Sequence, residues 1–136
     1  MVRSIINEPE IFIYIKDFGT QPGDFGVVAQ QNGQIIGAAW TRIIPSTESW
    51  RAYGHIDDET PELAISVLPE FRGYGVGNKL MKKLFDILRN NGCKQTSLSV
   101  QKDNPAVRLY QRLGYELSGE RLDHAGHEDY LMVKKL

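Results

Sequence analysis

The sequence predicts a single α/β domain in which a mixed β-sheet is covered by helices. The chain has 136 residues, which is enough for one hydrophobic core. A long segment with helical periodicity over residues 76–88 stands between two segments with strand character. Strands joined through one helix run parallel with a right-handed crossover. We therefore expect one domain over residues 1–136 with a parallel strand pair inside its sheet.

The first half of the chain combines an expected helix with several strands. Residues 9–18 carry apolar side chains at helical spacing after Pro9, which suits a first helical turn. Asn32-Gly33 predicts a tight hairpin turn, and residues 57–61 form an acidic turn. The expected strands of this half cover residues 25–30, 34–44, 50–56 and 62–68. The last of these is largely apolar, as is typical of the centre of a sheet.

The second half begins with the long amphipathic helix, which should stop at Asn91-Gly92. A shorter helix is expected over 104–113, with Asn104 as N-cap, Pro105 in the first turn and Gly114 as the stop. The expected strands of this half cover residues 96–100, 115–120 and 127–134.

Composition argues against several classes of function. The net charge is −1 and no basic stripe is present, so a nucleic-acid partner is not expected. No apolar run is long enough to cross a membrane, and the first residues do not resemble a signal peptide. The one cysteine, Cys93, cannot form an internal disulfide and is expected to be a small buried residue. His124 and His127 have no partner set for zinc, so we expect no metal, and the cytoplasm is the expected location.

A glycine-rich turn lies directly between the apolar strand at 62–68 and the long helix. Its sequence is Arg72-Gly73-Tyr74-Gly75-Val76-Gly77. Glycines let a ligand approach the backbone, and the first N–H groups of a helix attract phosphate. Asn78 stands where a dinucleotide fingerprint or a P-loop requires glycine, so neither motif is present.

Two motifs together give the sequence a family resemblance. Arg72-x-x-Gly75-x-Gly77 resembles the acetyl-CoA pyrophosphate loop of the GNAT superfamily of N-acetyltransferases. Residues 104–116, which read NPAVRLYQRLGYE, resemble the second motif of that family, N-x-x-A-x-x-L-Y-x-x-x-G-[FY]. The resemblance covers residues 25–135. It implies a mostly antiparallel GNAT-like sheet with a central splayed parallel pair, helices on both faces and shortened N-terminal elements.

The resemblance also assigns roles to residues in binding acetyl-CoA, which would serve as co-substrate. The backbone of Ile65, Ser66 and Val67 would bind the pantetheine arm, and Val67 or a neighbour would donate to the oxyanion. The pyrophosphate would bind to Arg72, Gly73, Tyr74, Gly75, Val76, Gly77 and Asn78. Asn104 would orient the pantetheine, cap its own helix, or do both.

Catalysis by this route requires an acid and a base. Tyr110 is the candidate acid for the leaving thiolate, and aromatic packing is its alternative role. Glu62 is the first candidate for the general base. The alternatives are Glu59, Asp58, Asp57 and His55, and the acids could also form only a solvated turn.

The acceptor side is less defined. Trp40, Trp50 and Tyr53 could line an acceptor pocket or pack in the core. Only 24 residues precede Phe25, so part of the usual acceptor wall is short and a partner subunit could supply it. A homodimer through the strands at 115–120 and 127–134 is one option.

The leading hypothesis is direct transfer of an acetyl group from acetyl-CoA to a primary amine of a small molecule or protein. The alternative is a non-catalytic acyl-CoA-binding or regulatory module with the same fold. A nucleotide-binding protein is disfavoured by the missing fingerprints.

Overall fold

A seven-stranded sheet forms the framework of the protein in the computed structural model, which describes residues 10–13, 24–43, 59–122, 126 and 128–136. The strands are β1 (Glu10–Ile13), β2 (Phe25–Gln31), β3 (Gln34–Arg42), β4 (Glu62–Val67), β5 (Gln95–Gln101), β6 (Glu116–Leu122) and β7 (Glu128–Lys135). The helices are α1 (Val76–Asn90), α2 (Ala106–Arg112) and the short 3-10 helix η2 (Pro69–Phe71).

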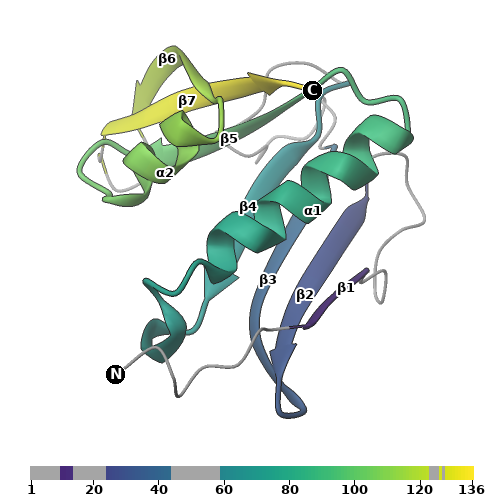
Figure 1. The fold of residues 1–136 in the computed structure, drawn as a ribbon. Coiled ribbons are helices and arrows are strands. Elements are labelled where there is room, and N and C mark those ends of the chain that lie inside the picture. Colours follow the sequence, from purple (N-terminus) through teal and green to yellow (C-terminus); the bar gives the residue numbers. More distant parts are fainter. Residues whose placement is uncertain (1–9, 14–23, 44–58, 123–125, 127) are drawn as a thin grey trace.

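The strand order is β1-β2-β3-β4-β5-β7-β6 (Figure 1). Every neighbouring pair is antiparallel except β4 and β5, which are parallel. The expected mixed, mostly antiparallel sheet with a central parallel pair is therefore confirmed.

The hairpin between β2 and β3 depends on its two turn residues. Asn32 and Gly33 both have positive φ, at 52° and 80°. This backbone belongs to two-residue turns whose twist matches that of the flanking strands. Glycine adopts it freely and asparagine tolerates it better than most residues. The predicted hairpin is confirmed, and β3 ends at Arg42.

The N-terminal prediction is wrong where the structure describes this segment. Residues 10–13 were expected to be helical, but they form β1, which pairs antiparallel with β2 along its whole length. Isoleucine and phenylalanine also favour strands, and pairing with the edge of β2 satisfies backbone groups that a four-residue segment cannot satisfy alone. The rest of the expected helix and the expected strand over 50–56 lie outside the described residues.

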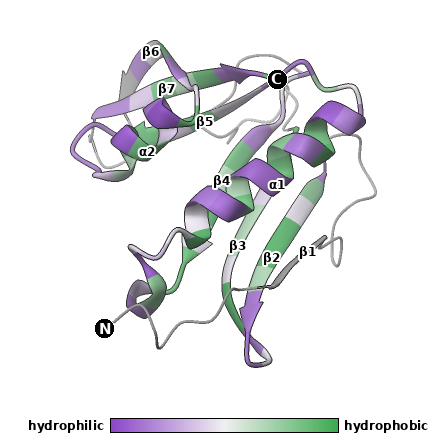
Figure 2. Cartoon of the chain, viewed as in Figure 1, coloured by the Kyte–Doolittle hydropathy of each residue, from purple (hydrophilic) through white to green (hydrophobic). Residues whose placement is uncertain are grey.

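Helix α1 covers β2, β3 and β4 with one apolar face (Figure 1). Figure 2 shows purple and green alternating along the helix, as its amphipathic spacing requires. Its buried side chains are Val76, Leu80, Met81, Leu84, Phe85 and Leu88. The predicted helix is confirmed, and it ends just before Asn91.

Helix α2 contributes to the same core through Tyr110. A methyl group built on Gly77 of α1 would lie 3.7 Å from Leu109 of α2, so the N-terminal turn of α1 lies next to α2. The N-cap position of α2 is Pro105, one residue later than the sequence predicted. The Asn104 side chain nevertheless accepts a hydrogen bond from the N–H of Ala106, the first helical residue, at 2.8 Å. A helix on the second face of the sheet is not among the described elements.

Strands β4 and β5 pair only where they begin. The recorded pair is Glu62 with Ser97. The Ser97 N–H and the Thr96 hydroxyl both donate to the carbonyl of Pro61, at 3.0 and 2.8 Å. Beyond this closed end the two strands diverge, as Figure 1 shows. We call the facing edges of β4 and β5 that have no recorded pair beyond Glu62 and Ser97 the opening. It confirms the expected splay.

The strand order bears on the expected homodimer, and two further observations concern membranes and metals. Strand β7 lies between β5 and β6, so only β6 of the two late strands forms a sheet edge. Within the described ranges, no helix is long and apolar enough to cross a membrane. The described residues also contain no group of three or more His, Cys, Asp or Glu suited to a metal ion, and His124 and His127 lie outside them.

Candidate active site

The glycine-rich turn presents backbone N–H groups at the start of α1. Gly73 and Gly75 have φ of 84° and 83°, a region that residues with a Cβ rarely adopt. A Cβ at either position would meet no atom within 4 Å, so backbone conformation, and not packing, requires glycine here. The first N–H groups of α1 have no partner within the helix and lie at the positive end of its dipole. This arrangement suits a phosphate.

Arg72 connects this turn to the end of β4. Its Nε donates a hydrogen bond to the carbonyl of Val67 at 3.1 Å. The guanidinium has five N–H donors in a fixed planar fork, so four remain for other acceptors. A positive charge is thereby held beside the phosphate-binding turn and tied to the strand that borders the opening.

The backbone of β4 alternates between its two neighbours. The Pro61 carbonyl accepts from Ser97 and therefore points toward β5. The N–H and C=O of one strand residue point to the same side, and successive residues alternate. Ile65 and Val67 therefore present their backbone groups to the opening, whereas Ser66 presents its own to β3. Two of the three predicted backbone positions border the opening, and Ser66 does not.

Tyr110 lies in the core that α1 and α2 share. Its side chain is 8% exposed, and its ring centroid lies 5.9 Å from that of Tyr115 in an edge-to-face arrangement. Burial raises the pKa of the Tyr110 hydroxyl above its ordinary value of 10.0, so the group is protonated at neutral pH. Packing and proton donation, the two roles suggested by the sequence, are both compatible with this position.

Glu62 begins β4 at the closed end of the opening. Its side chain is 9% exposed, and its strand neighbours are Arg42 on β3 and Ser97 on β5. It stands three residues before Ile65, so about 10 Å of strand separates them. A base at this distance would act through water. Of the alternatives, Glu59 is exposed, and Asp57, Asp58 and His55 lie outside the described residues.

The second motif is displaced by one residue. Counting back from Tyr110 with the spacing N-x-x-A-x-x-L-Y places the asparagine position at Asp103, and Asn104 follows it. The Asn104 oxygen is engaged by Ala106, which leaves its Nδ2 group for a ligand. The resemblance to the motif therefore holds at Ala106, Leu109 and Tyr110. The position of the family asparagine is occupied by Asp103 and not, as expected from the sequence, by Asn104.

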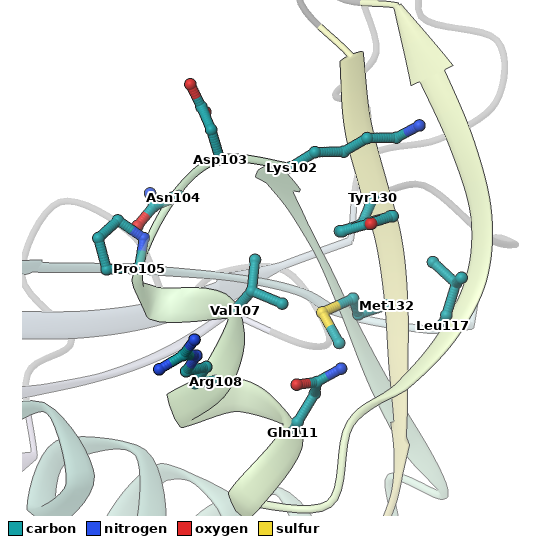
Figure 3. Close-up of a pocket in the computed structure, with 10 residues that line it drawn as sticks. All are labelled: Lys102, Asp103, Asn104, Pro105, Val107, Arg108, Gln111, Leu117, Tyr130 and Met132. Carbon is teal, nitrogen blue, oxygen red and sulfur yellow. The ribbon is translucent and has the colours of Figure 1, made fainter.

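A pocket of about 560 Å³ lies between α2 and the hairpin of β6 and β7. In Figure 3, Val107 and Gln111 of α2 face Leu117 and Met132 of the sheet. The i, i+4 spacing of Val107 and Gln111 could have indicated from sequence that they share one face of α2. The sequence does not indicate that Leu117 and Met132 of the sheet lie opposite them. Asn104 is the one predicted site residue among those that line the pocket, and no residue of β4 or of the glycine-rich turn does so. This pocket is therefore separate from the opening.

The comparisons with known proteins agree with this geometry. The pattern of the acetyltransferase (GNAT) family matches residues 4–115. Mycothiol acetyltransferase of Arthrobacter sp. (strain FB24) is 32% identical over 95 residues, which are 69% of this chain and 28% of that protein. Glucosamine 6-phosphate N-acetyltransferase of Trypanosoma brucei brucei is 38% identical over 88 residues, which are 63% of this chain and 54% of that protein. The chain thus matches about half or less of the length of these relatives.

A solved structure supports the same relationship. A protein from Salmonella typhimurium, determined with its cofactor acetyl-CoA, has a TM-score of 0.68 and 25% identity. The likeness covers 84% of this chain and 65% of that one. Since the family pattern spans most of the sheet, the glycine-rich turn and both helices, the chain belongs to the acetyltransferase (GNAT) family.

Proposed function

We propose that the protein transfers an acetyl group from acetyl-CoA directly to a primary amine. The observation that carries this proposal is the opening beside β4, which adjoins the phosphate-suited turn at Gly73 and Gly75. Acetyl-CoA combines a pyrophosphate with an arm that contains amide groups, and the two adjoining features match those two parts. Family membership supports the reaction class, and the Trypanosoma relative is named as an N-acetyltransferase.

The pantetheine arm would bind as an added strand. Ile65 and Val67 present backbone N–H and C=O groups to the opening, as an edge strand does when it binds an extended ligand. The Val67 carbonyl already accepts from Arg72, so the arm must share or replace this bond. Arg72 would then turn more of its donors toward the pyrophosphate.

The acetyl thioester supplies the group that is transferred. The amine nitrogen would form a bond to its carbonyl carbon while the N–H of Val67 stabilises the developing oxyanion. The carbon–sulfur bond would then break, and Tyr110 would donate its proton to the departing sulfur. Before the attack, Glu62 would take a proton from the substrate ammonium through a water molecule, because only the neutral amine has a free lone pair. The second proton, which the nitrogen loses as the amide forms, would pass through solvent and replace the one that Tyr110 gives to the sulfur.

A covalent acyl-enzyme is not part of this proposal. Cys93, the one cysteine of the chain, follows the C-terminal end of α1, whereas the glycine-rich turn precedes its N-terminal end. The 15-residue helix separates them by more than about 20 Å.

The first test is calorimetric binding of acetyl-CoA, with ATP and NAD as comparisons. We expect acetyl-CoA to bind and the two nucleotides to bind much more weakly. Tight binding of ATP or NAD without binding of acetyl-CoA would refute the proposal that the glycine-rich turn binds the pyrophosphate of acetyl-CoA. Binding of acetyl-CoA without release of thiol in the presence of any amine would favour a non-catalytic module.

The second test separates catalysis from packing at Tyr110. Tyr110→Phe keeps the ring and removes the hydroxyl, so kcat should fall by about 10²-fold or more while the Kd of acetyl-CoA stays unchanged. Tyr115→Phe is the matched control, because it removes a hydroxyl from the neighbouring buried ring. Equal kcat for wild type and Tyr110→Phe would eliminate Tyr110 as the acid.

A further inference from the structure

The side chains of β3 and β4 divide between two faces of the sheet. A methyl group on Gly37 would lie 3.1 Å from Leu80 of α1, and Ile65 lies near Gly77 of α1. Because strand side chains alternate, the residues between these positions lie on the face away from α1. We call this set the acceptor face; its members on β3 and β4 are Ala38, Trp40, Arg42, Glu62, Ala64 and Ser66.

An amine must approach the opening from the acceptor face if the proposed function is correct. The glycine-rich turn begins α1, and Tyr110 belongs to α2, so both lie on the other side of the sheet. The pyrophosphate and the proton donor would therefore occupy that side. The remaining access to a carbonyl carbon between β4 and β5 is from the acceptor face.

Trp40 is the one large apolar side chain of the acceptor face. It is 37% exposed and pairs across the strands with Ala64, which is also exposed. Because of this exposure, Trp40 is not a buried core residue, which was the alternative role suggested by the sequence. The small side chains of Ala38 and Ala64 leave the indole accessible beside the part of β4 that borders the opening.

The part of this face around Trp40 is apolar, because its neighbours there are Ala38 and Ala64. Apart from Trp40, the side chains of the acceptor face with hydrogen-bonding groups are Arg42, Glu62 and Ser66. Arg42 lies 3.9 Å from the carboxylate of Asp24, and Glu62 is the proposed base. A sugar would need several polar partners to replace its hydration, since unpaired polar groups are costly to bury. An apolar body needs none, and an aromatic ring also attracts an ammonium group before its proton is lost.

We propose that Trp40 determines acceptor specificity by contacting the carbon skeleton of the amine, and that it selects primary amines carried on an aromatic or alkyl body. This inference rests on the proposed acetyltransferase function. It makes Trp40 a substrate-contacting residue that acts on binding of the acceptor and not on binding of acetyl-CoA.

Steady-state kinetics with 2-phenylethylamine, ethylamine and glucosamine test the proposal. Wild type should prefer 2-phenylethylamine. Trp40→Ala should raise KM for 2-phenylethylamine about tenfold or more by removing the apolar contact, while the values for ethylamine change less than about twofold. Trp40→Phe should fall between wild type and Trp40→Ala. Leu117→Ala is the control, since Leu117 is 58% exposed on β6 and should leave all three values unchanged.

A binding measurement that needs no turnover accompanies the kinetics. The chain has two tryptophans, so Trp50→Phe leaves Trp40 as the one fluorophore of this type. Adding 2-phenylethylamine in the presence of coenzyme A should change its emission, and adding glucosamine should not.

Each outcome has a defined meaning. An equal loss for all amines in Trp40→Ala, a wild-type preference for glucosamine, or unchanged Trp40 emission overturns the proposal for Trp40 alone, provided that acetyl transfer is observed. Absence of both acetyl-CoA binding and thiol release refutes the proposed function, and the inference fails with it.

Discussion

Gly75→Ala should destabilise the protein through the backbone and weaken acetyl-CoA binding. Gly75 has φ of 83° and is the N-cap of α1, and no atom lies within 4 Å of the position of an added Cβ. The cost is therefore the conformational penalty of a left-handed L-residue, about 1–2 kcal/mol, with no added clash. For a chain of 136 residues this lowers Tm by roughly 4–8 °C.

The same strain should affect the ligand. If the loop relaxes to relieve it, the first N–H groups of α1 move away from the position that suits a phosphate. A loss of about 1.4 kcal/mol in binding corresponds to a tenfold increase in Kd. Urea unfolding followed by circular dichroism measures the first effect, and calorimetry with acetyl-CoA measures the second.

Gly77→Ala is the matched control because it adds the same methyl group two residues later. Gly77 lies inside α1 without a positive φ, and the methyl would lie 3.6 Å from Ile65 and 3.7 Å from Leu109, which is ordinary contact. Alanine favours a helix over glycine by about 1 kcal/mol, so this variant should be more stable than wild type. Unchanged stability in Gly75→Ala, or a larger loss in Gly77→Ala than in Gly75→Ala, would refute the reasoning.

Three further predictions concern the cap, the buried tyrosine and the thiol. Asn104→Ala removes the acceptor for the Ala106 N–H and should lower the free energy of unfolding by about 1 kcal/mol in urea, whereas Asn104→Asp should retain it. Burial raises the folded-state pKa of Tyr115 above 10.0, so the unfolded chain loses this proton first. Stability should thus hold below about pH 10 and fall above it, and urea titrations from pH 8 to 11 should show a smaller fall in Tyr115→Phe. Cys93 is half-buried, less than the sequence predicted, and this partial burial raises the pKa of its thiol. Iodoacetamide at pH 8 should therefore alkylate the folded protein more slowly than the urea-unfolded chain, and equal rates would contradict this.

Local sequence signals predicted the parts of the fold that local physics determines. The apolar period of α1 and the Asn32-Gly33 turn each act within a few residues, and both are confirmed. Asn104 accepts a hydrogen bond from the first turn of α2, although the helix begins one residue later than predicted. Strand β1 was missed because the short apolar run of Ile11, Phe12 and Ile13 fits a helix or a strand equally well. Its pairing with β2, a contact remote along the chain, decides between them.

The candidate site shows the same division. The glycine-rich turn could be located from sequence, because glycine, helix start and strand follow one another directly. The register of β4 could not be predicted from sequence. Ser66 was therefore expected to bind the pantetheine arm together with Ile65 and Val67, although its backbone groups face β3. The exposure of Trp40 also depends on its small cross-strand neighbour, Ala64, and on the face that α1 covers.

Because β4 and β5 pair at a single point, the backbone amide hydrogens of β4 are unevenly protected against exchange with solvent. Amide hydrogens of Ala64 and Ser66 lie in the ladder with β3, while those of Ile65 and Val67 point to the side where no further pair with β5 is recorded. Hydrogen–deuterium exchange along this one strand should therefore alternate between slow and fast residues. A ligand that occupies the opening as an extra strand would slow the fast residues and leave the slow ones as they are, so the alternation itself reports whether the sheet is complete.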